Sequence, residues 1–226
     1  MYTADQPLDV ALLLDTTGTM GTYAAHLCRN LDGLTAELAR VVGDVRVGVV
    51  AFKDHGHEGE DVTYLTRALR LTSDRARLQR FVTSPALAPG AGGGGAEAVE
   101  CALRAARGLG WREDARRVAV LVGDKPPHGA GLDELSACPY HVDYRDEVEA
   151  LAAQGVALHT VQVGEHLVTR RVFEYMAART GGEFVDLERL RDLPEVVATA
   201  CLGAGASLLR RRPVAGRARV AGLVAA

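Results

Sequence analysis

Two observations predict an α/β fold with three layers, in which helices cover both faces of a doubly wound, mostly parallel sheet. Short apolar runs alternate with helical patterns along the chain, as in proteins built from β-α units. The runs at 10–14 and 118–122 are continuously apolar, which is typical of strands buried on both faces of a parallel sheet. A length of 226 residues suits one large domain with a sizeable core.

The same alternation predicts the individual elements. Strands are expected at 9–15, 45–52, 62–71, 117–123, 157–163 and 183–186, with the third as a candidate antiparallel edge. Helices are expected at 21–42, 73–83, 96–108, 143–153, 169–179 and 193–203. Ser73 is the predicted N-cap of the second helix, and the glycines at 155, 181 and 182 are helix-stop signals.

Composition and charge indicate a globular domain over residues 1–208 and a basic tail over 209–226. Hydrophobic residues make up 48% and charged residues 24% of the chain, which is ordinary for a soluble domain. The formal net charge is −3, and the acidic body argues against a nucleic-acid binder. The tail is expected to be a flexible end or a linker, with nucleic-acid or membrane binding as the weaker alternative. Its basic residues are Arg210, Arg211, Arg212, Arg217 and Arg219.

The cysteines and the start of the chain favour the cytoplasm. Cys28, Cys101, Cys138 and Cys201 are far apart and form no Cys-x-x-Cys pair, so all four are expected to be thiols in a reducing compartment. Cys138 stands beside a proline and is expected to be the most exposed of them. No signal peptide pattern precedes the first strand, and no apolar run is long enough to span a membrane.

The loop after the first predicted strand combines one carboxylate with two hydroxyl groups. Asp15, Thr17 and Thr19 alternate along it at spacing two. Because open α/β sheets bind ligands at the carboxyl ends of their strands, this oxygen cluster is suited to Mg²⁺ or Mn²⁺. The alternative is that Thr17 or Thr19 simply caps the following helix.

Two further loops support the metal interpretation. Asp124 ends another apolar run, and a glycine-rich stretch at 92–95 opens into a helix between the two aspartates. Loops with Asp-x-Thr-x-Thr, a glycine-rich stretch and a later Asp, in this order, resemble the von Willebrand factor A (vWA) domain, in its bacterial cytoplasmic form. The resemblance extends over about residues 8–200.

The resemblance implies a metal-ion-dependent adhesion site made of Asp15, Thr17, Thr19 and Asp124, the last of them acting through a water molecule. The ion would be Mg²⁺, or else Mn²⁺ or Ca²⁺, and would capture an exposed Asp or Glu of a protein partner. An AAA+ ATPase or an effector protein of a bacterial stress or conflict system is the kind of partner implied. Neither a nucleic-acid nor a membrane partner is expected.

The glycine-rich loop departs from the vWA pattern. Members of the family place a Thr or an Asp where this chain has glycine, with Gly94 as the best match. Glu97 is the nearest oxygen donor in this region. Its competing interpretation is a carboxylate at the start of the helix, stabilised there by the helix dipole. The middle ligand is therefore missing, replaced by water, or supplied by Glu97.

A second polar cluster follows the second predicted strand. His55 and His57 stand among acidic residues and could bind zinc, with His128 of the later Pro-rich segment as a candidate neighbour. A solvated turn is the favoured interpretation, because no cysteine or histidine lies at zinc-finger spacing from them.

Catalysis is not expected from these loops. A haloacid-dehalogenase-like phosphotransferase needs a second acid two residues after its first aspartate, and Thr17 stands there. The glycine run is not followed by Lys-Ser/Thr, and the chain has no Gly-x-Ser-x-Gly elbow. The favoured function is a non-enzymatic protein-binding module. A metal-free vWA scaffold that binds through its rim loops is the first alternative, and the phosphotransferase is the second.

Overall fold

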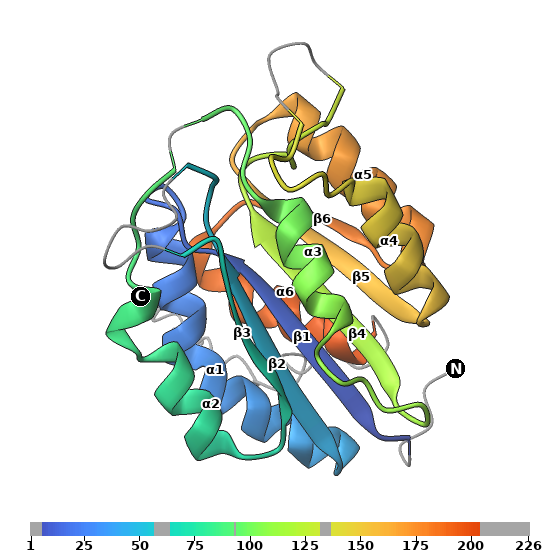
Figure 1. Cartoon of the computed structure of the whole chain (residues 1–226). Helices are drawn as coiled ribbons and strands as arrows, with labels where there is room; N and C mark the ends of the chain where they lie inside the picture. Colours follow the sequence, from blue (N-terminus) through green and yellow to red (C-terminus); the bar gives the residue numbers. More distant parts are fainter. Residues whose placement is uncertain (1–5, 57–63, 93, 132–136, 204–226) are drawn as a thin grey trace, which may run out of the picture.

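A six-stranded sheet forms the centre of the computed structural model, which describes residues 6–56, 64–92, 94–131 and 137–203 (Figure 1). The strand order is β3-β2-β1-β4-β5-β6. All neighbouring strands run parallel except β3, which is antiparallel to β2. The strands are β1 Leu8–Asp15, β2 Val45–Phe52, β3 Thr66–Thr72, β4 Arg116–Gly123, β5 Val156–Val163 and β6 Phe184–Leu187.

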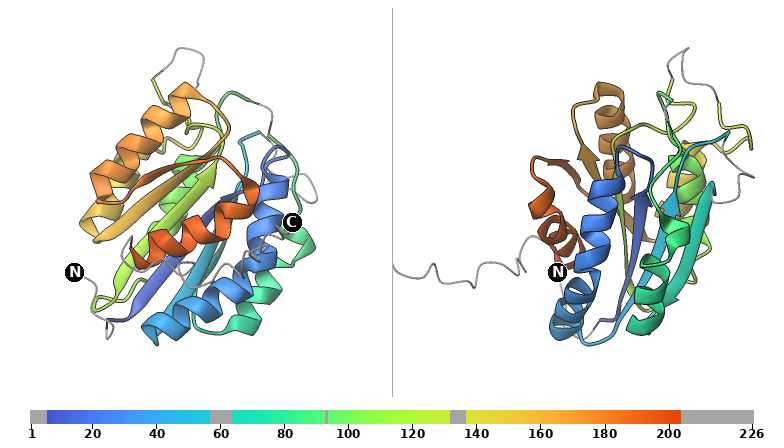
Figure 2. Two further views of the ribbon diagram at one scale, coloured as in Figure 1. Left: turned by 180° about the vertical axis from the view of Figure 1, so that it is seen from behind. Right: turned by 90° about the vertical axis from the view of Figure 1, so that its left-hand side faces the viewer.

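Helices cover both faces of this sheet (Figure 2). The residues of α1, α2 and α6 share one hydrophobic core with β1, and those of α3, α4 and α5 share a second core on the other side. Within the described residues the helices are α1 Gly21–Val42, α2 Arg75–Val82, α3 Val99–Arg107, α4 Tyr144–Ala153, α5 Leu167–Thr180 and α6 Leu193–Leu202. Two short 3₁₀ helices are also present: η1 Pro85–Leu87 follows α2, and η2 Leu190–Asp192 lies between β6 and α6. The predicted three-layer α/β fold is confirmed.

The central strand explains why its sequence is apolar without interruption. Every residue of β1 is buried, because β2 and β4 flank it and helices cover both its faces. Leu12 and Leu14 belong to the core shared with α1, whereas Ala11 and Leu13 belong to the core shared with α3. This alternation follows from the two-residue period of a strand. β1 therefore places Asp15, its last residue, at a rigid position.

The predicted elements are found with small shifts at their ends. The segment predicted as a candidate edge strand at 62–71 forms β3 at Thr66–Thr72, which is antiparallel at the sheet edge. The helix expected from residue 96 begins only at Val99. The backbone of Ala98 is not helical (ψ +47°), and the N–H groups of Glu97 and Ala98 donate to Pro126 O and Lys53 O of neighbouring segments.

The N-cap of α2 is Asp74, and the prediction of Ser73 is wrong. The Asp74 carboxylate accepts a hydrogen bond from the backbone N–H of Arg77 at 2.9 Å. We expect Asp74→Ala to lower the free energy of unfolding by about 1 kcal/mol, the usual effect of losing such a cap. Ser73→Ala is the matched control and should leave stability within about 0.5 kcal/mol of wild type. Urea denaturation of both variants measures this, and equal losses would contradict the assignment.

The prediction for Cys138 is also wrong, since this residue is only 3% exposed. It packs with Ala98, Cys101 and Val142 in a small third core, because the segment before α4 folds back onto α3. The tail at 209–226 and the predicted domain boundary at residue 208 lie outside the described residues. Among the helices of the described residues, none has the length and apolar character needed to cross a bilayer.

Candidate functional site

The strand register brings the predicted site residues to one edge of the sheet. Asp15 is paired with Phe52 of β2, and Leu14 is paired with Val122 of β4. The loops that follow β1, β2 and β4 therefore begin side by side. An idealised Cβ at Gly123 would lie 3.7 Å from Asp15 Oδ2. The Asp15 carboxylate thus lies beside the end of β4, one residue before Asp124.

The Asp15 carboxylate organises its own loop. Asp15 is 2% exposed, and its Oδ1 accepts hydrogen bonds from the backbone N–H of Thr17 at 2.8 Å and from Thr17 Oγ1 at 2.6 Å. The N-cap of α1 is Met20, which makes no side-chain hydrogen bond to the helix. The capping interpretation of Thr17 and Thr19 is therefore wrong. Thr17 is turned toward Asp15, whereas Thr19 is exposed farther along the loop.

Glu97 faces the same loop from the glycine-rich segment. An idealised Cβ at Gly92 would lie 3.0 Å from Thr17 Cβ and 3.1 Å from Glu97 Oε1, so both side chains contact the surface of Gly92. Any larger residue at 92 would also be strained, because its φ is +84°. Glu97 is buried and lies two residues before α3 rather than in its first turn. This glycine lets the carboxylate approach Thr17.

Gly94 lies beside Asp54 and not beside Thr17 or Glu97. An idealised Cβ there would lie 3.2 Å from Asp54 Oδ2. A carboxylate introduced at position 94 would be repelled by the adjacent Asp54 carboxylate. Among the described residues of the middle loop, Glu97 is therefore the oxygen donor that reaches the Asp15 loop.

Three carboxylates at this edge each have a buried oxygen without a hydrogen-bond partner among the described residues. The atoms are Asp15 Oδ2, Glu97 Oε2 and Asp124 Oδ1. Burial raises the pKa of Asp15 to about 7 against the hydrogen bonds from Thr17, and Asp124 adds to the rise. The pKa of Glu97 is raised to about 9, chiefly by burial and then by repulsion from Asp15, Asp54 and Asp124. A bound cation would reduce the repulsion among these three carboxylates and would bond their unpaired buried oxygens.

Lys53, which no sequence pattern indicates, is a buried cation that interacts electrostatically with Asp15 and Glu97. Its side chain is 1% exposed, and its ammonium donates to the backbone carbonyls of Thr16, Ala88 and Gly90 at 2.7, 3.1 and 2.6 Å. All three N–H groups of the ammonium are used in this way. Burial lowers the pKa of Lys53, while Asp15 and Glu97 oppose that shift. Lys53 thus fastens the loops around the site and leaves the three carboxylate oxygens unpaired.

The donor set fits a hard divalent cation. Carboxylate and hydroxyl oxygens are the ligands that Mg²⁺, Mn²⁺ and Ca²⁺ prefer, and Mg²⁺ keeps several waters when a protein offers few ligands. Asp15, Glu97 and Asp124 would supply anionic oxygens, and Thr17 Oγ1 retains lone pairs while it donates to Asp15. The predicted residues Asp15, Thr17 and Asp124 are thus brought together, with Glu97 added.

In the described part of the second polar cluster, residues 54–56, the histidine side chain is buried and not solvated as expected. The side chain of His55 is 6% exposed and lies 2.9 Å from Glu100 Oε1. His128 Nε2 lies 2.8 Å from Asp54 Oδ1, so the predicted approach of His128 to this cluster is found. His57 lies outside the described residues.

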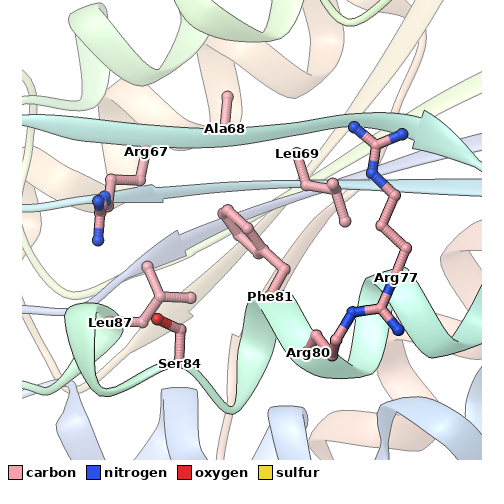
Figure 3. Close-up of a pocket in the computed structure, with 8 residues that line it drawn as sticks. All are labelled: Arg67, Ala68, Leu69, Arg77, Arg80, Phe81, Ser84 and Leu87. Atoms are coloured by element: carbon pink, nitrogen blue, oxygen red, sulfur yellow. The ribbon is translucent and has the colours of Figure 1, made fainter.

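An open groove between α2 and β3 shares none of these residues. Figure 3 shows Arg67 and Leu87 at one end of it and Arg77 and Arg80 at the other, with Phe81 between the two ends. Because the guanidinium groups do not converge, the groove offers no single point for a small anion. The predicted metal-binding residues lie instead at the carboxyl ends of the strands.

Comparison with known proteins finds similarity at the level of the fold. No protein-family model and no curated protein matches the chain. Among solved structures, the pilus adhesin SpaC from Lactobacillus rhamnosus GG in its open conformation is similar over 87% of this chain, with a TM-score of 0.59 and 14% identity. The match covers 30% of the adhesin chain.

An aerotolerance-related membrane protein from Bacteroides fragilis NCTC 9343 is similar over 86% of this chain and 98% of its own. The TM-score is 0.51 and the identity is 14%. At this identity the likeness shows a shared fold and nothing about the site.

Proposed function

We propose that the chain is a vWA-type, non-enzymatic module that binds a protein partner through a divalent cation, Mg²⁺ in the first instance. Asp15, Thr17 and Asp124 would hold the ion as the sequence predicts, and Glu97 would supply the ligand that glycine at position 94 lacks. Thr19 would complete the set from the exposed side of the loop. The ion would attract an exposed Asp or Glu of the partner.

One observation carries this proposal, namely the three buried carboxylate oxygens that lack a hydrogen-bond partner among the described residues. They come from the end of β1, the segment before α3 and the loop after β4, all at the carboxyl ends of the strands. Gly18 and Thr19 are exposed beside Asp15, so a partner can approach at this point. The partner would be a protein with an acidic surface, of which an AAA+ ATPase or an effector protein is the kind that the vWA resemblance implies.

A metal-free scaffold is the second candidate, because Lys53 already places a positive charge near Asp15 and Glu97. Its hydrogen bonds to three carbonyls favour the first candidate, since they leave the carboxylates without a bonded cation. Calorimetric titration distinguishes the two candidates. A well-folded protein that binds no Mg²⁺ at pH 8 would leave the scaffold as the function.

Glu97→Gln should weaken Mg²⁺ binding by at least about tenfold, or about 1.4 kcal/mol, because it removes an anionic ligand. Glu113→Gln makes the same chemical change at an exposed position before β4, at the opposite end of that strand from Asp124, and should leave the affinity unchanged. Titration of both variants with MgCl₂ measures the difference. Equal affinities would place Glu97 outside the site.

Partner capture is tested with a displayed library of short peptides rich in Asp and Glu. Binding that requires Mg²⁺, is lost with chelator and is lost in Asp15→Asn would support the adhesion function. Peptides retained equally in chelator would indicate a metal-free scaffold. Hydrolysis of a generic phosphoester that depends on Asp15 would favour the phosphotransferase alternative and contradict the proposal.

A further inference from the structure

A second group of side chains, distinct from the Asp15 cluster, brings four metal-ligating atoms together. They are His55 Nε2, Glu100 Oε1, Cys101 Sγ and Cys138 Sγ, and all lie within 4.8 Å of one another. His55 follows β2, Glu100 and Cys101 lie in the first turn of α3, and Cys138 precedes α4. We propose that these four side chains form a structural site for one Zn²⁺ ion.

Four of the six distances between the atoms match a tetrahedral site. Zinc bonds of about 2.3 Å to sulfur and 2.0–2.1 Å to nitrogen or oxygen place the ligand atoms about 3.3–3.8 Å apart. The two sulfurs are 3.7 Å apart. His55 Nε2 lies 3.4 Å from Cys138 Sγ and 3.8 Å from Cys101 Sγ. Glu100 Oε1 lies 3.8 Å from Cys101 Sγ.

Glu100 Oε1 and Cys138 Sγ lie within 4.8 Å of each other, and the last of the six pairs is closer than a tetrahedral edge. His55 Nε2 and Glu100 Oε1 are 2.9 Å apart, at hydrogen-bond distance. A cation between them would separate these two atoms by about 0.4 Å more, to the edge length of a tetrahedral site. Such an adjustment is within reach of side-chain torsions alone. The backbone segments are therefore already placed for metal binding.

Burial of the side chains and a hydrogen bond that orients Glu100 both favour a preformed metal site. The side chains of His55 and Glu100 are 6% and 0% exposed, and both cysteines are buried. The other oxygen of Glu100, Oε2, accepts a hydrogen bond from the backbone N–H of His128 at 3.2 Å. This contact orients the carboxylate so that Oε1 faces the cluster. Contacts of this kind commonly fix the ligands of metal sites.

The donor types select zinc among the common ions. Two thiolates, one imidazole and one carboxylate suit Zn²⁺ in tetrahedral geometry, whereas Mg²⁺ and Ca²⁺ prefer oxygen ligands throughout. Four protein ligands leave no open position, which is typical of a structural site. The ion would fasten the segment around Cys138 to α3 and to the end of β2. This inference does not depend on the proposed Mg²⁺ function.

The first test uses the wild-type chain, purified without a polyhistidine tag. Elemental analysis should find one zinc per chain. Replacement by Co²⁺ should give thiolate-to-cobalt charge-transfer bands and the visible absorption of a tetrahedral centre. Folded protein with neither bound zinc nor a cobalt spectrum would overturn the proposal. So would a disulfide between Cys101 and Cys138 in protein purified anaerobically, detected by mass spectrometry.

The second test compares two cysteine substitutions. Cys138→Ser removes a proposed ligand and should weaken zinc binding by more than about 100-fold, since loss of an outer contact alone costs 10–100-fold. Cys28→Ser changes a half-buried thiol of α1 that lies outside the cluster and should retain one zinc per chain. Competition with a chelating dye measures both affinities. Equal zinc affinity in the two variants would overturn the assignment of Cys138.

Discussion

Asp15→Asn is expected to abolish Mg²⁺ binding and, at the same time, to stabilise the metal-free protein at pH 8. The substitution removes the carboxylate that lies next to Thr17 and close to Asp124 and Glu97. The loss of affinity should exceed about 100-fold, or about 2.8 kcal/mol. The free energy of unfolding should rise by about 1–3 kcal/mol, because asparagine carries no charge, whereas the Asp15 carboxylate is a buried charge without a bound metal ion.

The sign of the stability change follows from the pKa of Asp15. Burial raises this pKa from the ordinary 3.8 to about 7 in the folded, metal-free protein. The folded state therefore binds the proton more tightly than the unfolded state. The resulting stabilisation is complete below about pH 4 and is lost as the pH rises through 7. The amide introduced by Asp15→Asn cannot ionise, so the variant should lose this part of the pH dependence.

Urea denaturation between pH 4 and pH 8 in chelator measures this effect. Wild type should lose stability across the interval, and Asp15→Asn should lose less. Saturating Mg²⁺ should reverse the trend for wild type alone, because the ion binds the ionised carboxylates. A variant that is less stable than wild type at pH 8 in chelator would contradict the account.

Lys53→Met is expected to lower the free energy of unfolding by about 3–5 kcal/mol. The ammonium satisfies the carbonyls of Thr16, Ala88 and Gly90, and methionine of similar length offers them no donor. Buried carbonyls that lose a charged donor carry a large desolvation cost. The loss should also loosen the segment at 88–90 from the Asp15 loop.

The chain contains only one other lysine, Lys125, which provides the matched control. Lys125 is partly exposed, so Lys125→Met should change stability by no more than about 0.5 kcal/mol. Chemical denaturation at pH 7 compares the two variants. A loss below about 1 kcal/mol for Lys53→Met would show that its hydrogen bonds do not hold the loops together.

The fold was predictable because its signals are local and periodic. The apolar run of β1 and the helical pattern of α1 can be recognised without any knowledge of their neighbours. Helix ends were less predictable because they depend on distant contacts. The start of α3 is one example, since Glu97 and Ala98 before it bond to Pro126 and Lys53, which are distant in the sequence.

The candidate sites were predictable only where their residues lie close together in the sequence. Asp15 and Thr17 share one short loop, and Asp124 could be recognised because, like Asp15, it follows an apolar run. Nothing in the sequence indicates that Lys53 turns inward, because an isolated lysine after a strand is usually solvated. Cys101 and Cys138 have no zinc-finger spacing, so folding alone brings them to His55.

The proposed function requires that the unpaired carboxylate oxygens at the carboxyl ends of the strands hold a divalent cation. A crystal grown at pH 8 with Mn²⁺, measured at the manganese absorption edge, tests it most directly. We expect an anomalous peak at bonding distance from Asp15 Oδ2 and Glu97 Oε2. A well-ordered loop without such a peak, in crystals where this edge of the sheet is open to solvent, would contradict it.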